Sequence, residues 1–233
     1  MKYLFLALAL SAMAARSQLC EFECPSGTKM LQDYEYVSNG CGSETMGIRV
    51  DPEFAFEPCC DLHDACYEIC GMARETCEDE FSSCMKKVCD GLTNEDDRAR
   101  CSNQQKLFVF GTTAFGCVSF LSAQKESCTC AEPSACSLEA QVAPPAFMEG
   151  AAAAAAGEAA CDPAKQLMRG ALEKMYGKLS MADKAGNATF IESTLDKHEA
   201  KYPELVLSMI KQYPKQLIKM KEWGASDNDA DRV

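Results

Sequence analysis

Residues 59–71 read CCDLHDACYEICG. On an α-helix, this spacing places four side chains on one face, namely Cys59, His63, Cys66 and Cys70. Gly71 is a typical stop signal for such a helix. The stretch therefore predicts a helix that holds a histidine among cysteines.

A second helix is expected to follow Gly71. Its predicted face consists of Cys77, Phe81, Cys84 and Val88. The spacing between Cys59 and Cys66 equals that between Cys77 and Cys84, so pairing the first cysteine with the last keeps both bridges level between antiparallel helices. The sequence thus indicates a mainly α, disulfide-rich fold built on two antiparallel helices.

The N-terminus determines how the cysteines are interpreted. Residues 1–16 combine a basic start, an apolar run and small residues, which is typical of a secretory signal peptide. The apolar run is shorter than the roughly 20 residues of a transmembrane helix, and a buried N-terminal helix is the alternative. We therefore expect a secreted, extracellular protein with no transmembrane segment, whose 16 cysteines are paired.

The composition divides the chain into further segments. Most cysteines lie between Cys20 and Cys130, which predicts a disulfide-rich domain over residues 17–130. Residues 131–160 are rich in proline and alanine and are interpreted as a linker, and the polar residues 224–233 are expected to be disordered. Between them, residues 161–223 are predicted to form a helical extension that is a separate unit.

The extension shows helical spacing of apolar residues, which predicts three or four short helices. Proline is accepted in the first turn of a helix, so Pro203 and Pro214 mark two helix starts. We interpret the apolar stripe as helix core or as a face for an unidentified protein partner, with a membrane-lying helix as the alternative. This stripe includes Met209, Ile210, Leu217 and Met220. The pairing of Cys136 and Cys161, and glycosylation of the sequon at Asn187, stay open.

Charge and composition exclude several function classes. The formal net charge is −12, whereas nucleic-acid binding needs a basic face. The chain has only two histidines, which argues against Cys/His zinc sites.

His63 and its surroundings favour catalysis over simple packing. A histidine takes a proton from water near neutral pH. Asp64 projects about 100° further round the helix and is free to bind a cation. Upstream, residues 39–47 read NGCGSETMG, a glycine-rich loop able to turn carbonyls inward. Carbonyls with one carboxylate form a hard oxygen set that suits calcium.

These motifs together resemble a known family. The run C-C-x-x-H-D-x-C-Y resembles the active-site helix of secreted phospholipases A₂. With N-G-C-G-S-x-x-x-G before it and C-x-x-E-F-x-x-C after it, the pattern is similar to the group XII branch. The resemblance covers about half of the chain and does not extend to residues 131–233.

The resemblance implies roles for particular residues. His63 matches the general base, and Tyr67 matches the tyrosine that supports the dyad carboxylate. Asp64 matches the calcium carboxylate, and three loop residues match its carbonyl ligands: Gly40, Gly42 and Glu44. The Gly42 N–H is implied to face the developing oxyanion as well. Three family disulfides are implied: Cys41–Cys60, Cys59–Cys84 and Cys66–Cys77.

The chain departs from the family at the dyad carboxylate. The family has an aspartate directly after the cysteine at position 77, and this chain has Glu78. The longer side chain predicts an imidazole held slightly off line, and Asp79 is a poorer candidate because it lies about 100° further round the helix.

The function expected from the resemblance is calcium-dependent hydrolysis of the sn-2 ester of phospholipids at membrane or vesicle surfaces. Its cofactor is Ca²⁺, and its products are a fatty acid and a lysophospholipid. The rival interpretation is a catalytically weak or inactive secreted binding protein on the same scaffold, an interpretation that Glu78 and the acidic surface favour.

Overall fold

The protein is described here by a computed structural model that covers residues 20–24, 30–31, 35–130 and 162–221. The predicted signal peptide, the linker and the polar tail lie outside these described residues, as do Cys136 and Cys161. The expectations for those segments therefore stay predictions.

Two helices form the predicted antiparallel pair. α2 spans Glu57–Tyr67 and α3 spans Arg74–Asp90. The bridges Cys59–Cys84 and Cys66–Cys77 join them, and Cys41–Cys60 joins the preceding loop to α2. All three implied disulfides are therefore confirmed.

The first helix ends three residues earlier than its cysteine spacing predicted. The buried amide of Gln124 donates to the carbonyls of Tyr67 at 2.8 Å and Ile69 at 2.7 Å, and its oxygen accepts from the Gly71 N–H at 2.9 Å. These bonds satisfy backbone groups that the helix end leaves unpaired. Cys70 consequently lies beyond the helix and is bonded to Cys128.

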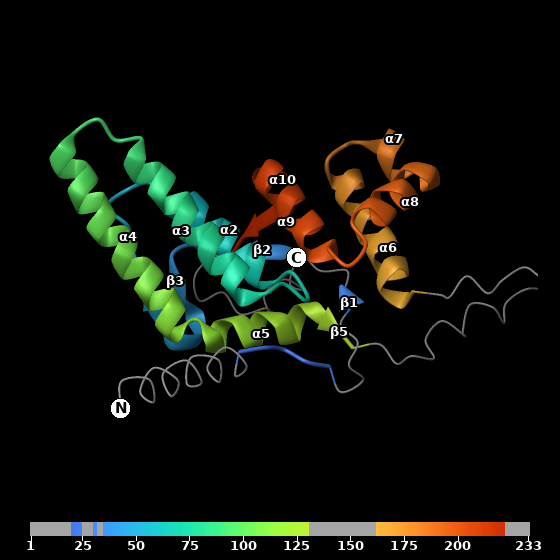
Figure 1. Ribbon diagram of the computed structural model, residues 1–233, viewed down its shortest axis with the longest axis horizontal. Helices are drawn as coiled ribbons and strands as arrows, with labels where there is room; N and C mark the ends of the chain where they lie inside the picture. Colours follow the sequence, from blue (N-terminus) through green and yellow to red (C-terminus); the bar gives the residue numbers. More distant parts are fainter. Residues whose placement is uncertain (1–19, 25–29, 32–34, 131–161, 222–233) are drawn as a thin grey trace, which may run out of the picture.

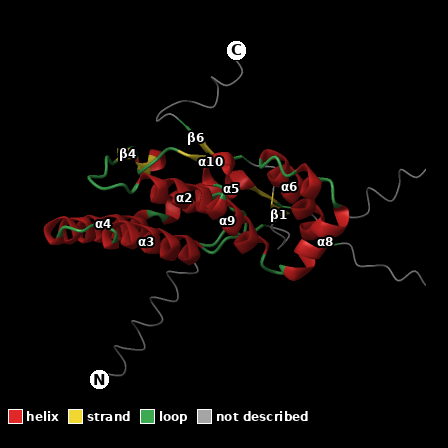
Figure 2. Cartoon of the chain, turned by 90° about the horizontal axis from the view of Figure 1, so that it is seen from above, coloured by secondary structure: helices red, strands yellow, loops and turns green. Residues whose placement is uncertain are grey.

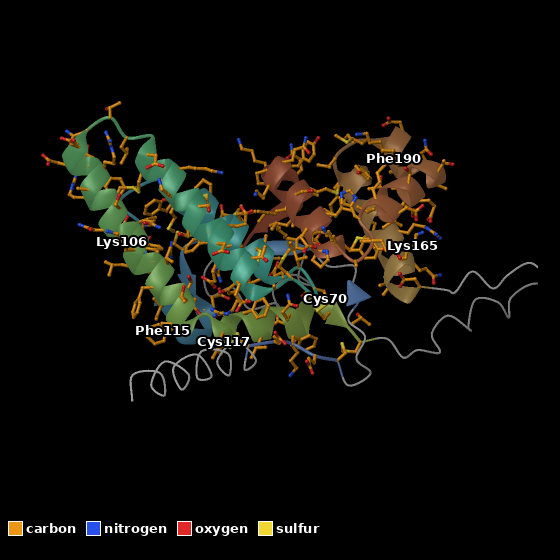
Figure 3. All side chains as sticks on the ribbon, in the orientation of Figure 1. Cys70, Lys106, Phe115, Cys117, Lys165 and Phe190 are labelled. Atoms are coloured by element: carbon orange, nitrogen blue, oxygen red, sulfur yellow. A yellow bond between two sulfur atoms is a disulfide. The ribbon has the colours of Figure 1, made fainter. Side chains whose placement is uncertain are left out.

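Two more helices continue from the α2–α3 pair. α4 spans Glu95–Phe115, and Asn94 caps its first turn by accepting from the N–H groups of Asp96 and Asp97. α5 spans Cys117–Ser127. Gly116 separates the two helices, which are bent by 65° at this point. Figure 1 shows α3 and α4 as a projecting hairpin, and Figure 3 shows Phe115 and Cys117 at the bend.

The extension contains five helices among the described residues, rather than three or four. They are α6 Pro163–Lys178, α7 Ala182–Ala185, α8 Ala188–Lys197, α9 Tyr202–Gln212 and α10 Pro214–Leu217. The starts of α9 and α10 confirm the helix boundaries predicted from Pro203 and Pro214. The apolar stripe, however, does not continue in a helix to Met220, which is 58% exposed on a strand.

Short strands form three pairs among the described residues. β1 (Met30–Leu31) is antiparallel to β5 (Cys128–Thr129), and β3 (Gly42–Ser43) is antiparallel to β4 (Ile48–Arg49) across the 3₁₀ turn η1 (Glu44–Met46). β2 (Tyr36–Ser38) is parallel to β6 (Ile218–Met220). The last pair joins the start of the described domain to the end of the extension.

The buried core consists of two clusters with α2 between them. One cluster lies among α2, α3 and α4 and contains Phe56, Phe81 and Met85. The other contains Ile69 and Met72 from the disulfide-rich domain together with Val206 and Ile210 from the extension. Figure 2 shows the α3–α4 hairpin and the helices α6 and α8 at opposite ends of the molecule.

The extension was predicted to be a separate unit, but in the structure it packs on the disulfide-rich domain. α9 packs on α2, and a side chain at Gly71 would meet Pro203 Cγ at 3.8 Å. The apolar stripe is therefore largely covered by the chain's own core, since Met209, Ile210 and Leu217 are buried. Sequence periodicity gives the apolar face of a helix but does not say which surface covers it.

No single helix among the described residues is long and apolar enough to cross a membrane. The bent pair formed by α4 and α5 meets the criteria of length and composition only when its two helices are taken together.

Candidate active site

His63 lies on the inner face of α2 and is only 7% exposed. Its ring packs between Tyr67, at 4.2 Å between ring centroids, and Phe81 of α3, at 4.4 Å. The disulfides on either side hold α2 and α3 together, so the imidazole is fixed on a rigid element. Its Nε2 atom faces Glu78 Oε1 at 3.5 Å, a close approach that does not meet hydrogen-bond geometry.

Glu78 lies on α3 and is 8% exposed. Tyr67 Oη donates to its Oε1, and Thr112 Oγ1 of α4 donates to its Oε2. Burial by itself would raise the pKa of this carboxyl, but the neighbouring His63 and the hydroxyls of Thr112 and Tyr67 lower the pKa below its usual value. Glu78 is therefore an ionised carboxylate beside the imidazole, whereas Asp79 is exposed to solvent.

Arg74 supplies a positive charge beside Glu78. Its Nη1 lies 3.5 Å from Glu78 Oε1 and donates to the Thr112 carbonyl at 3.3 Å. The guanidinium offsets part of the cost of burying the carboxylate and joins α3 to the end of α4. Burial, followed by the charge of Glu78, raises the pKa of Tyr67, so its hydroxyl stays a donor.

The glycine-rich loop lies directly against α2. Gly40 has φ +83°, a conformation that favours glycine, and Cys41 bonds the loop to Cys60. The Asn39 N–H donates to Asp64 Oδ2 at 3.2 Å. The structure therefore brings the loop and the Asp64 carboxylate together, as the sequence predicted.

Asp64 belongs to a small anionic cluster centred on Ser38. Ser38 Oγ lies 2.9 Å from Asp64 Oδ2 and 2.7 Å from Asp61 Oδ1, although a hydroxyl has only one hydrogen to donate. Burial raises the pKa of Asp64 to about 8, although the hydrogen bonds from Ser38 and Asn39 lower it. The negative charges of Asp61 and Glu44 also raise this pKa. Burial also raises the pKa of Asp61. Burial is the main cause of both shifts, and a cation bound at Asp64 would favour its charged form.

A cavity of about 640 Å³ connects these groups. His63, Tyr67 and Thr112 contribute to its lining together with Asp64 and the loop. Apolar residues of the loop and α4 also line it, and several of them are exposed: Met46, Ile48, Leu107 and Phe115. The site therefore combines a buried polar dyad with an apolar entrance, an arrangement that suits an amphipathic ligand.

The residues expected to bind calcium fit such an ion chemically. Gly40, Gly42, Glu44 and Asp64 all line this cavity. The Glu44 carbonyl accepts from the Gly47 N–H at 3.0 Å and keeps a second lone pair. Within the described residues no group of three or more His, Cys, Asp or Glu side chains is arranged to hold a metal ion. A calcium ion would therefore depend on backbone oxygens as well as on Asp64.

The sequence did not reveal four residues that shape the site: Ser38, Arg74, Thr112 and Gly116. Thr112 and Gly116 reach it only because α4 folds back on α3, and no local pattern carries that information. Arg74 has one signal, since it lies four residues before Glu78 on one helix face. Ser38 directly precedes the turn residues Asn39 and Gly40, but its carboxylate partners come from α2.

The helix pair, the disulfide framework and the cavity define a protein of the secretory phospholipase A₂ type. A family model described as Group XII secretory phospholipase A2 precursor matches residues 3–137. This range is more than half of the chain, and the chain therefore belongs to the group XII family. The match ends before α6, so the extension lies outside it.

Individual relatives agree with the family. The human Group XIIA secretory phospholipase A2 is 31% identical over 136 residues, which cover 54% of this chain and 71% of the relative. The mouse Group XIIB secretory phospholipase A2-like protein is 27% identical over 137 residues, covering 53% and 70%. Conodipine-P2 of Conus purpurascens is 38% identical over 58 residues, covering 24% and 31%. No solved structure matches this chain.

Proposed function

We propose that the protein is a secreted, calcium-dependent phospholipase A₂ that hydrolyses the sn-2 ester of phospholipids at a membrane or vesicle surface. The observation that carries the proposal is the position of His63, which lies between Glu78 and a cavity that also exposes Asp64 and the glycine-rich loop. A base, a carboxylate to orient it and a place for a hard cation thus meet at one apolar opening.

His63 acts as the general base in this proposal. Glu78 faces Nε2 at 3.5 Å, and its negative charge favours the proton on that nitrogen, which leaves Nδ1 to accept a proton from water. The water oxygen bonds to the sn-2 carbonyl carbon. The proton then passes from His63 to the departing alkoxide oxygen as the ester C–O bond breaks, which yields a fatty acid and a lysophospholipid.

Gly40, Gly42 and Glu44 would hold calcium through their carbonyls, together with the Asp64 carboxylate. When bound there, calcium supplies a Lewis acid for the ester carbonyl and a counter-charge for the phosphate. The loop and Asp64 line the same cavity as His63, so the base and the cation ligands face one substrate.

A second candidate function is that of a weakly catalytic or inactive lipid-binding protein. Glu78 favours it, because both of its oxygens accept from hydroxyls while His63 Nε2 has no hydrogen bond. An imidazole held this loosely would lose some of the orientation that catalysis requires. The same cavity and entrance would still bind lipid.

Release of fatty acid from phosphatidylcholine–phosphatidylglycerol vesicles, with calcium or with a chelator, separates the two functions. We expect calcium-dependent release by the parent protein and almost complete loss in His63→Gln. His198→Gln is the matched control, because the other histidine lies in the extension and contacts Thr194 O at 2.9 Å. Equal release by the parent and a folded His63→Gln protein would end the catalytic assignment, and no release by the parent would favour the binding protein.

A further inference from the structure

The segment of the chain outside the family match reaches the candidate active site. β6 pairs with β2 in parallel, with Tyr36 opposite Ile218 and Ser38 opposite Met220. Lys221 follows β6 directly, and this residue is part of the cavity lining. A strand from the extension thus runs beside the strand that leads into the glycine-rich loop.

Ser38, the last residue of β2, connects this pairing to the site. The residue is 1% exposed, and its carbonyl accepts from the Lys221 N–H at 2.8 Å. Its hydroxyl contacts Asp64 and accepts from the Gly40 N–H at 3.0 Å. One buried residue therefore joins the extension, the start of the glycine-rich loop and the Asp64 carboxylate on α2.

β2 packs on α2 and pairs with β6. It spans three residues, and among the described strands it pairs only with β6. The carboxylate of Glu68, which directly follows α2, accepts from the Val37 N–H at 2.6 Å. Isolated short strands are marginal in water, so the ladder to β6 adds to the contacts with α2 in fixing where Ser38 and Asn39 lie relative to Asp64.

We infer that the C-terminal extension is part of the catalytic site, and that the Lys221 N–H positions Ser38 and thereby orients the Asp64 carboxylate and the glycine-rich loop. This inference rests on the proposed function, because it assigns the positioned groups to calcium and substrate binding. Lys221 is a positioning residue here through its backbone, and the extension acts as a brace for the site.

Two substitutions at one position separate the backbone from the side chain. Lys221→Pro removes the N–H that Ser38 accepts, whereas Lys221→Ala keeps the N–H and removes the ammonium. The first readout is hydrogen exchange of the backbone over residues 38–40 in calcium-free protein. We expect faster exchange in Lys221→Pro and parent-like exchange in Lys221→Ala, since the Asn39 and Gly40 N–H groups depend on Asp64 and Ser38.

The second readout is calcium titration by calorimetry, followed by vesicle hydrolysis. We expect the calcium Kd of Lys221→Pro to rise about 10-fold, the low end for removing a group that orients a metal ligand. The calcium Kd of Lys221→Ala should stay within about 2-fold of the parent value. Ser38→Ala, which keeps the strand pairing and loses the hydroxyl, should weaken calcium binding about as much as the proline variant, and it serves if the proline variant fails to fold.

The outcomes distinguish this inference from the proposed function. If Lys221→Pro matches Lys221→Ala in exchange and in calcium affinity, the positioning role is wrong. If the alanine variant loses as much as the proline variant, the effect belongs to the ammonium and the inference is again wrong. A parent protein that releases no fatty acid would refute the proposed function, while exchange and calcium titration would still decide whether β6 positions the site.

Discussion

At the scale of single residues, the main departure from the family is a carboxylate with one more methylene. Glu78 reaches His63, Tyr67 and Thr112 from a position that the cysteine spacing holds in place. Asp79 points to solvent and offers no alternative. The residue that orients the imidazole can therefore be tested by substitution at one position.

Glu78→Ala should lower turnover by about 100-fold or more, because the imidazole loses its orienting carboxylate. Glu78→Asp is the matched variant that keeps a carboxylate, and we expect its turnover to equal or exceed that of the parent. Steady-state vesicle hydrolysis at saturating calcium measures both. Parent-like turnover in Glu78→Ala would show that another group orients His63.

The lowered pKa of Glu78 also predicts how stability depends on pH. The pKa of this carboxyl is lower in the folded state than its ordinary value of 4.5, so the ionised group stabilises the fold at pH values above 4.5. This contribution is lost as the pH falls through the pKa of the folded state. The stability difference between the parent and Glu78→Gln should thus be larger at about pH 7 than at about pH 3. Denaturant unfolding of the two calcium-free proteins at both pH values gives this difference, and a pH-independent difference would contradict it.

Asp64 and Asp61 share one serine hydroxyl but differ in their access to the cavity. Only Asp64 is part of its lining. Asp64→Asn should therefore weaken calcium binding by about 100-fold, and Asp61→Asn by less than about 10-fold, the range for groups that orient a ligand. Calorimetric titration of both variants is the measurement. Equal losses would mean that Asp64 has no special role toward calcium.

At the scale of elements, the bend between α4 and α5 brings Gly116 close to both Thr112 and the Tyr67 hydroxyl. A Cβ at Gly116 would lie 2.5 Å from Tyr67 Oη and against the Thr112 carbonyl. Tyr67 Oη donates to Glu78 Oε1, and the hydroxyl of the same Thr112 donates to Glu78 Oε2. The close approach of the two helices therefore requires glycine at this bend.

Gly116→Ala should destabilise the protein by about 1–3 kcal/mol, because the added methyl overpacks this junction. Gly111→Ala, on the neighbouring helix α4, is the control, since a Cβ there meets no atom within 4 Å. The control should gain up to about 1 kcal/mol from helix propensity. Denaturant unfolding compares the two, and a Gly116→Ala protein as stable as the control would contradict the packing argument.

Local patterns predicted the elements whose position follows from the spacing of cysteines and prolines along the chain. The cysteines at 59, 66, 77 and 84 fix two antiparallel helices, and the prolines at 203 and 214 mark two helix starts. The same reasoning missed β6, because Leu217 and Met220 fit the spacing of a helical apolar stripe, whereas Ile218–Met220 is a strand paired with β2. Propensity is a weak guide wherever a distant partner decides the structure.

At the scale of the whole molecule, the extension and the disulfide-rich domain share one buried cluster. Ile69 and Met72 lie in this cluster with Val206 and Ile210 of α9. Ion pairs such as Lys211–Glu80, at 2.7 Å, also cross the boundary, but exposed pairs contribute little. Apolar burial is thus the main term that holds the two parts together.

A chain that ends at Cys130 should be less stable than the full chain, although it keeps all seven disulfides formed among the described residues. Removing α9 exposes at least Ile69 and Met72, which are 0% and 4% exposed in the full chain. Each such side chain contributes about 1.5–3 kcal/mol when buried, so we expect a loss of about 3 kcal/mol or more. A chain ending at Trp223 is the control, because it keeps every described residue. Thermal and denaturant unfolding of the three chains measure the effect. An unchanged midpoint in the shortest chain would mean that the extension only lies on a domain that is already complete without it.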